Sequence, residues 1–173
     1  MFTDIHNCCM LLGTADDILI LCHKSPDGDT IGAAYGLYHA LTQLGRRAAV
    51  RCSDPLPEKF AYIHGGIEMP EFEPQLIIAV DIAGPGLLGP ALEQYADRVD
   101  LCIDHHVSNK GYALTNIIDG DASSACEVIC RLLDMEKVSR DAASALYMGI
   151  AHDTGVFQYS CTSPETMRLA AAL

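Results

Sequence analysis

Three short apolar segments of this chain each end directly in an aspartate or a histidine. The segments are residues 18–22, 76–80 and 99–103, and they are followed by His23, Asp81 and Asp104. Short segments rich in aliphatic side chains are typical of strands buried on both faces, and the helical patterns between them favour a parallel sheet. The carboxyl ends of parallel strands form the crevice where ligands bind. The sequence therefore predicts that three strands direct acidic and imidazole groups to one place.

The rest of the chain alternates helical and strand patterns. Two further strands are expected at 48–52 and 116–118, and the stretch 55–74 is expected to be a long connection. Helices are expected within 1–17, at 30–44, 90–96, 121–134 and 139–152, and from Pro164 onward behind Ser163 as the N-cap. We predict a single α/β domain of three layers, with a mostly parallel β-sheet flanked by helices and a metal site at the carboxyl ends of the strands.

Composition limits the class of substrate and the compartment. The 173 residues carry a formal net charge of -12, which argues against a broad basic surface for long duplexes and fits a short or mononucleotide substrate better. Eight cysteines lack the paired spacing of a structural zinc site, and several lie in expected core elements, so reduced thiols are predicted. No apolar stretch approaches the ~20 residues that cross a bilayer. A cytoplasmic location with no membrane partner is expected.

The residue types at the strand ends suit divalent metal ions. In the turn after the first strand, Asp27 and Asp29 are expected to leave non-helical backbone in opposite directions, so that they reach two different ions. Asp81 lies between them in the predicted sheet and would bridge the ions. Converging carboxylates need neutralisation, and oxygen ligands with a minority of imidazole favour manganese over zinc. Two ions about 3.5–4 Å apart would activate a water for in-line attack on a phosphoryl group, without a covalent intermediate.

The same residues resemble the DHH phosphoesterase superfamily. The matching motifs, in chain order, are His23-x-x-x-Asp27-x-Asp29 with Gly32, then Asp81, then Asp104-His105-His106 with Asn109, and Gly149-x-x-x-Asp153-Thr154-Gly155-x-Phe157. They span residues 18–157, and within the superfamily they look most like the branch of bifunctional oligoribonucleases and adenosine 3′,5′-bisphosphate phosphatases.

The resemblance implies a set of roles for named side chains. One manganese ion would be held by His23, Asp27 and Asp81, and a second by Asp29, Asp81, His105 and Asp153. His106 would contact the scissile phosphate, and Asp104 would orient the neighbouring ligands. Mg²⁺ or Co²⁺ could substitute for manganese. The catalytic set is therefore Asp81, Asp104, His105 and His106.

Two features depart from that branch. Its members usually carry a C-terminal substrate-binding domain, to which nothing in residues 1–173 corresponds, so a further domain is expected in the full-length protein. Ala33 stands where serine often follows the glycine, outside the implied ligand set. The chain is thus predicted to be the DHH catalytic domain alone, and a homo-oligomer is left open.

Several polar residues have simpler interpretations. Ser123 and Ser124 are expected first to cap a helix, with a contact to substrate phosphate as the alternative. His152 is predicted to be a helix-end residue rather than a ligand. Lys24, Arg46 and Arg47 are weak candidates for substrate phosphates, and solvent exposure is the preferred interpretation for the two arginines.

The predicted function is a manganese-dependent phosphoesterase that hydrolyses short oligonucleotides or a nucleoside 3′,5′-bisphosphate. One alternative is a manganese inorganic pyrophosphatase, which shares the Asp104-His105-His106 signature. Another is a regulatory module that binds metal or nucleotide with little turnover.

Overall fold

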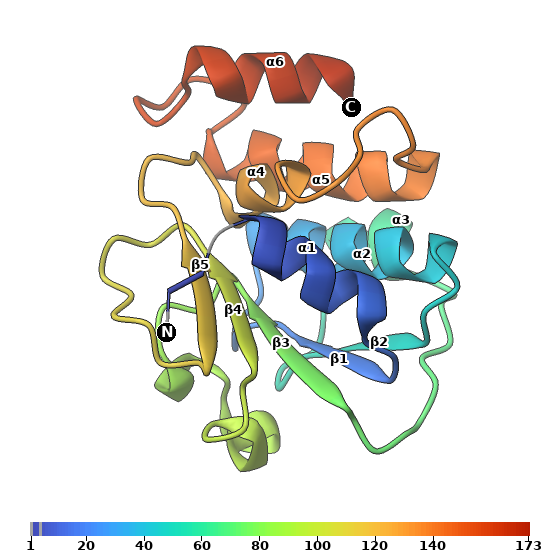
Figure 1. The fold of residues 1–173 in the computed structure, drawn as a ribbon. Coiled ribbons are helices and arrows are strands. Elements are labelled where there is room, and N and C mark those ends of the chain that lie inside the picture. Colours follow the sequence, from blue (N-terminus) through green and yellow to red (C-terminus); the bar gives the residue numbers. More distant parts are fainter. Residues whose placement is uncertain (1, 4) are drawn as a thin grey trace.

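The computed structural model describes residues 2–3 and 5–173, and these contain a five-stranded sheet in which every pairing is parallel (Figure 1). The strands are β1 (Ile18–Leu21), β2 (Ala48–Arg51), β3 (Leu76–Val80), β4 (Leu101–Asp104) and β5 (Thr115–Ile118). Their order in the sheet is β2-β1-β3-β4-β5. The three strands that were predicted to carry the site are therefore neighbours, with β3 in the middle. The α/β class with a mostly parallel sheet is confirmed.

The α-helices gather on one face of this sheet, and α6 lies outside α4 and α5 (Figure 1). Their bounds are α1 (Ile5–Thr14), α2 (Gly28–Gln43), α3 (Ala61–His64), α4 (Ala125–Cys130), α5 (Arg140–Asp153) and α6 (Pro164–Ala172). Three 3₁₀ helices complete the described elements: η1 (Glu58–Phe60), η2 (Pro85–Leu87) and η3 (Pro90–Tyr95).

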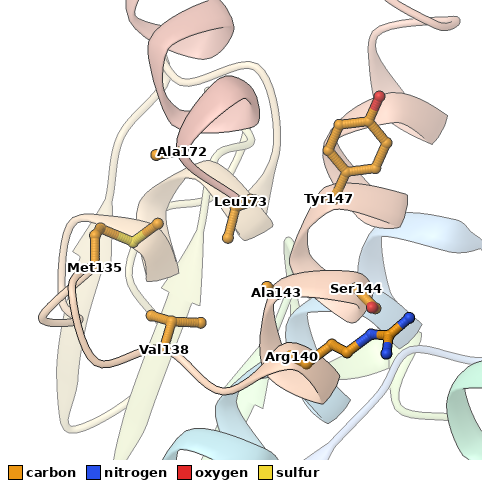
Figure 2. Close-up of a pocket in the computed structure, with 8 residues that line it drawn as sticks. All are labelled: Met135, Val138, Arg140, Ala143, Ser144, Tyr147, Ala172 and Leu173. Atoms are coloured by element: carbon orange, nitrogen blue, oxygen red, sulfur yellow. The ribbon is translucent and has the colours of Figure 1, made fainter.

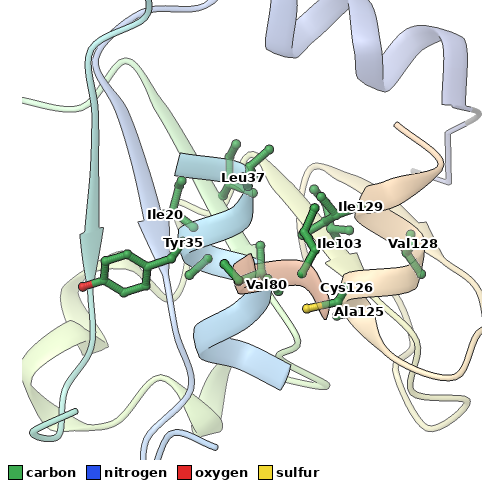
Figure 3. Packing of buried hydrophobic residues seen from close by; sticks show 14 of the residues in the cluster. Ile20, Tyr35, Leu37, Val80, Ile103, Ala125, Cys126, Val128 and Ile129 are labelled. Carbon is green, nitrogen blue, oxygen red and sulfur yellow. The ribbon is translucent and has the colours of Figure 1, made fainter. Parts of the chain in front are cut away.

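Alternation along the strands builds two cores. Ile20, Val80 and Ile103 face the helices and pack with Cys126 and neighbouring side chains (Figure 3). On the opposite face, the strand residues in between pack against Leu88 and Leu92 of the segment that contains η2 and η3. These strand residues are Leu19, Leu21, Ile77, Ala79 and Cys102. The second face is thus covered by 3₁₀ turns and loops, where a helix had been expected at 90–96.

A close contact between α2 and α5 fixes the ends of both helices. A Cβ at Gly32 would lie 2.5 Å from the carbonyl oxygen of Ala145, so a larger residue at that position would force the helices apart. Because α2 begins and α5 ends at the carboxyl edge of the sheet, the contact brings Asp29 and Asp153 to the same crevice as the strand ends. Helix packing therefore completes the site that the strands begin.

Several predicted boundaries need correction. The helix expected at 30–44 begins earlier, at Gly28, because the side chain of Asp27 accepts hydrogen bonds from the backbone N–H groups of Asp29 and Thr30. The helix expected at 121–134 is shorter, since Ser124 caps it and it spans only Ala125–Cys130. The connection at 55–74 contains η1 and α3. The Ser163 cap is confirmed, together with a capping box at Thr166.

Candidate active site

Asp81 occupies the centre of the crevice, directly after β3. Its backbone is in the left-handed region, with φ of 58°, a conformation that is uncommon for a residue other than glycine and that recurs at active sites. The side chain is buried, and its Oδ1 has no hydrogen-bond donor among the described residues. Imidazole nitrogens of His105 and His106 lie 3.5 Å from Oδ1, and Nε2 of His23 lies 3.5 Å from Oδ2. This buried carboxylate oxygen thus faces two imidazole nitrogens without a short hydrogen bond.

One group of candidate ligands joins His23, Asp27 and Asp81, whose ligand atoms lie within 4.8 Å of one another. Nδ1 of His23 is 2.7 Å from the carbonyl oxygen of Lys24, so the ring donates there and directs Nε2 into the crevice. Burial opposes ionisation, yet the facing carboxylates of Asp27 and Asp81 raise the pKa of His23 to about 10. His23 and the N–H of Thr30 in turn lower the pKa of Asp27 to about 2, against the effect of burial.

A second group joins Asp29, His105 and Asp153, again within 4.8 Å. Nε2 of His105 lies 3.8 Å from Asp29 and 3.3 Å from Asp153. Burial would lower the pKa of His105, but the surrounding carboxylates raise it to about 9. Burial, together with the nearby charges of Asp81 and Asp153, raises the pKa of Asp29 well above its usual range.

Asp29 also fixes the start of α4. Its Oδ2 accepts the N–H of Ala125 at 2.6 Å, and its Oδ1 accepts the N–H of Cys126 at 3.0 Å. A carboxylate at a helix N-terminus satisfies free backbone donors and interacts favourably with the helix dipole. Asp29 lies in the first turn of α2, so the predicted non-helical backbone was wrong for this residue. Asp27 and Asp29 still belong to different ligand groups.

Asp104 accepts hydrogen bonds from both adjacent histidines, His105 and His106. Its Oδ1 accepts Nδ1–H of His106 and the backbone N–H of His105, each at 2.8 Å. Its Oδ2 accepts from Asn109, whose amide also donates to the carbonyl oxygen of Ile82. Burial opposes ionisation, but these donors lower the pKa of Asp104, and Asp104 raises the pKa of His106. His106 is 45% exposed, and its Nε2 has no hydrogen-bond partner among the described residues.

These groups fit a divalent metal. The distances between nitrogen and oxygen atoms, 3.3–3.8 Å, are longer than those of typical hydrogen bonds. Ligand atoms that share one ion at about 2.0–2.2 Å lie roughly 3.0–3.5 Å apart. The orphaned oxygen of Asp81 and the imidazoles of His23 and His105, each with Nδ1 turned to a backbone carbonyl, are the usual surroundings of a metal ion. Oxygen donors with fewer nitrogens suit Mn²⁺ better than softer ions.

The serines predicted as alternative substrate ligands are engaged elsewhere. Ser124 accepts the N–H of Glu127 as the N-cap of α4, and the hydroxyl of Ser123 donates to the carboxylate of Glu127 at 2.6 Å. Both serines are buried. The structure therefore favours the capping interpretation over a phosphate contact.

The structure also bears on the predictions made for His152 and for three basic residues. His152, predicted to be a helix-end residue, lies with Asp27 and Asp153 in a further group of ligand atoms within 4.8 Å. Arg47 pairs with Asp17, and Arg46 bonds to the carbonyl of Gly13, so both arginines are engaged before β1 rather than at the carboxyl edge. Lys24 is exposed beside His23.

A separate pocket of about 620 Å³ lies between the start of α5 and the end of α6 (Figure 2). Arg140 and Tyr147 line its α5 side and Leu173 its α6 side. Arg140 begins the helix that Asp153 ends, a separation of about 20 Å at 1.5 Å per residue. This pocket is therefore distinct from the carboxylate crevice.

Among the described residues, no helix is long and apolar enough to span a membrane.

Comparisons with known proteins converge on one family. The model described as the N-terminal domain of the DHH family matches residues 17–150. The chain is 31% identical over 164 residues to the bifunctional oligoribonuclease and PAP phosphatase NrnA of Thermus thermophilus, covering 90% of this chain and 49% of the relative. The chain thus spans about half the length of such curated relatives.

Solved structures support the fold. An exopolyphosphatase-related protein from Bacteroides fragilis aligns with a TM-score of 0.86 at 24% identity, covering 97% of this chain and 55% of that one. A Methanococcus jannaschii protein described as a putative family II inorganic pyrophosphatase aligns with a TM-score of 0.60 at 20% identity, covering 89% and 54%.

Proposed function

Because this chain belongs to the DHH family, we propose that it is the phosphoesterase domain of an enzyme that hydrolyses short oligoribonucleotides or a nucleoside 3′,5′-bisphosphate. The observation that carries the proposal is Asp81, a buried carboxylate on left-handed backbone, with one oxygen unpaired among the described residues and three imidazoles around it. The relative named above supports the class of substrate.

The proposed ligands for two manganese ions follow the two groups of side chains, with Asp81 added to the second because its Oδ1 lies 3.5 Å from His105. His23, Asp27 and Asp81 would hold one ion, and Asp29, Asp81, His105 and Asp153 the other. Bound ions of this kind lower the pKa of water and neutralise phosphoryl oxygens, and Mg²⁺ or Co²⁺ could replace manganese.

The chain's own residues orient the substrate. His106 would donate from Nε2 to a non-bridging oxygen of the scissile phosphate, since Asp104 engages Nδ1. Asn109 holds Asp104 in place by bonding its other oxygen and the carbonyl of Ile82. A hydrogen-bond donor that is already in position need not reorient when negative charge develops on the phosphate. Such preorganised donors stabilise the transition state and so accelerate the reaction.

Charge favours a short substrate. The chain carries a net charge of -12. The adjacent residues Arg46 and Arg47 contact Gly13 and Asp17, which precede β1, and not groups of the crevice. Long nucleic acids need many phosphate contacts from basic side chains. A substrate with one or two phosphates needs few such contacts, and the crevice with Lys24 would supply part of them. We further propose that a second domain in the full-length protein completes substrate binding.

The test is a substrate panel with the manganese-loaded chain and with its full reading frame. We expect the full-length protein to release mononucleotide from a 5′-phosphorylated diribonucleotide and orthophosphate from adenosine 3′,5′-bisphosphate. Asp81→Asn should abolish both activities, and Asp97→Asn, which changes an exposed carboxylate, should change neither. A preference for pyrophosphate would favour the pyrophosphatase alternative, which the fold similarity alone does not support. Binding of nucleotide without turnover would favour the regulatory alternative.

A further inference from the structure

His152 has a position that the ligand sets above leave unused. It lies at the end of α5, next to Asp153, and its ring packs edge-on against Phe60 with centroids 5.9 Å apart. On the other side the ring covers Gly28, where a Cβ would lie 2.4 Å from Cγ of His152. The absence of a side chain at Gly28 leaves room for the ring above the start of α2. Packing therefore fixes the imidazole at the rim of the crevice.

The ring nitrogens of His152 are uncommitted. His23, His105 and His106 each turn Nδ1 to a backbone carbonyl or a carboxylate. Across the described part of the chain, the ring of His152 makes no hydrogen bond, and its recorded ion-pair contact is Nδ1 to Oδ1 of Asp153 at 3.9 Å. The side chain is 37% exposed, so solvent and ions reach it. An imidazole held by packing alone keeps both nitrogens available.

The partners it faces are carboxylates. A nitrogen of His152 and one oxygen each of Asp27 and Asp153 lie within 4.8 Å of one another, as do the atoms of the two groups assigned to metals. We propose that these three residues form a third divalent-cation site. The inference rests on the proposed function, because Asp27 and Asp153 are also assigned to the other two sites.

The chemistry of this donor set selects a class of ion. One imidazole and two carboxylates suit Mn²⁺ and similar ions, and three protein ligands leave positions for water or for a substrate oxygen. The third site shares each carboxylate with an inner site, so its ion gains less from them and is repelled by its neighbours. We therefore expect the third ion to bind at least tenfold more weakly than the inner pair.

The experiment counts bound Mn²⁺ in the intact chain from the electron paramagnetic resonance signal of the free ion. We expect three ions per wild-type chain, the third weaker than the others. His152→Phe keeps a ring against Phe60 but removes both nitrogens, and it should bind two. His152→Ala should also bind two, which covers the case of a misfolded phenylalanine variant. His39→Phe is the matched control, because His39 lies outside every ligand group and also packs on an aromatic ring; it should bind three.

The outcomes separate this proposal from the proposed function. Saturation of the wild type at two ions, or a third ion retained in both His152 variants, would overturn the third site and leave the phosphoesterase proposal standing. Saturation at one ion or none would overturn the third site and the two-ion arrangement as well, while the substrate panel tests the phosphoesterase activity separately. Loss of the weak ion in the His152 variants alone supports the assignment.

Discussion

Replacement of Thr166 by valine should destabilise the protein through a single hydroxyl group. Oγ1 of Thr166 donates to Oε2 of Glu127 at 2.7 Å and accepts the N–H of Ser163 at 3.1 Å. Glu127 is fully buried, and its carboxylate also accepts from Ser123 and Arg131. Valine keeps the shape of threonine but removes one donor to a buried charge and half of the capping box of α6.

The magnitude follows from the contacts that are lost. A hydrogen bond to a charged group contributes about 1.5–3 kcal/mol, and a buried acceptor left short of donors adds to the cost. With part of the cap lost as well, we expect the free energy of unfolding to fall by about 2–4 kcal/mol. For a chain of this size each kcal/mol lowers Tm by about 2–4 °C, which gives a decrease of about 4–16 °C.

Thermal unfolding followed by circular dichroism measures this effect. Thr166→Ser keeps the hydroxyl, so its free energy of unfolding should stay close to that of the wild type. Thr162→Val is the matched control four residues earlier, because the hydroxyl of Thr162 is buried and has no partner among the described residues. Because the substitution removes an unpartnered hydroxyl, it should leave the free energy of unfolding unchanged or raise it. Equal Tm values for Thr166→Val and Thr162→Val would refute the role of Glu127 as the link between α4 and α6.

Three further predictions concern the metal centre. Asp81→Asn should weaken Mn²⁺ binding by more than the roughly 10–100-fold typical of residues behind the ligands, measured by calorimetric titration; near-normal affinity would remove Asp81 from the bridge. His106→Ala should keep Mn²⁺ affinity and lose about 10²–10³-fold in single-turnover rate, whereas His105→Ala should lose affinity first; the reverse pattern would exchange their roles. Mn²⁺ at a hundredfold excess over Kd should raise the free energy of unfolding by about 2.7 kcal/mol per site, and chelation should reverse it; an unchanged Tm would count against a metal centre in the folded state.

The strand-end residues could be predicted because the geometry of a parallel sheet is simple. Asp81, Asp104 and His105 follow apolar segments that are strands, and every strand of this sheet ends at the same edge. No information beyond the local pattern was needed to bring them together. Asp153 required the motif as well, since its position depends on how α5 packs against α2.

What the sequence misplaced or left open depends on contacts between distant segments. Asp29 was expected on non-helical backbone, but the cap from Asp27 draws it into α2. His152 does lie at a helix end as predicted, but its position over Gly28 depends on the packing of α5 and on Phe60 from the connection after β2. Side-chain neighbours of this kind depend on the rotation and position of one helix relative to another. The spacing of hydrophobic residues does not specify these.

The start of α4 shows how the chain itself satisfies a helix N-terminus. Ser123 and Ser124 were expected first to cap the helix, with a contact to substrate phosphate as the alternative. The structure supplies the anion from within the chain, since both carboxylate oxygens of Asp29 accept N–H groups of the first turn. Two of the free donors of α4 are thereby used, and Ser124 satisfies a third at Glu127. A substrate phosphate at this position would have to displace a buried carboxylate, so His106 is the better candidate to contact it.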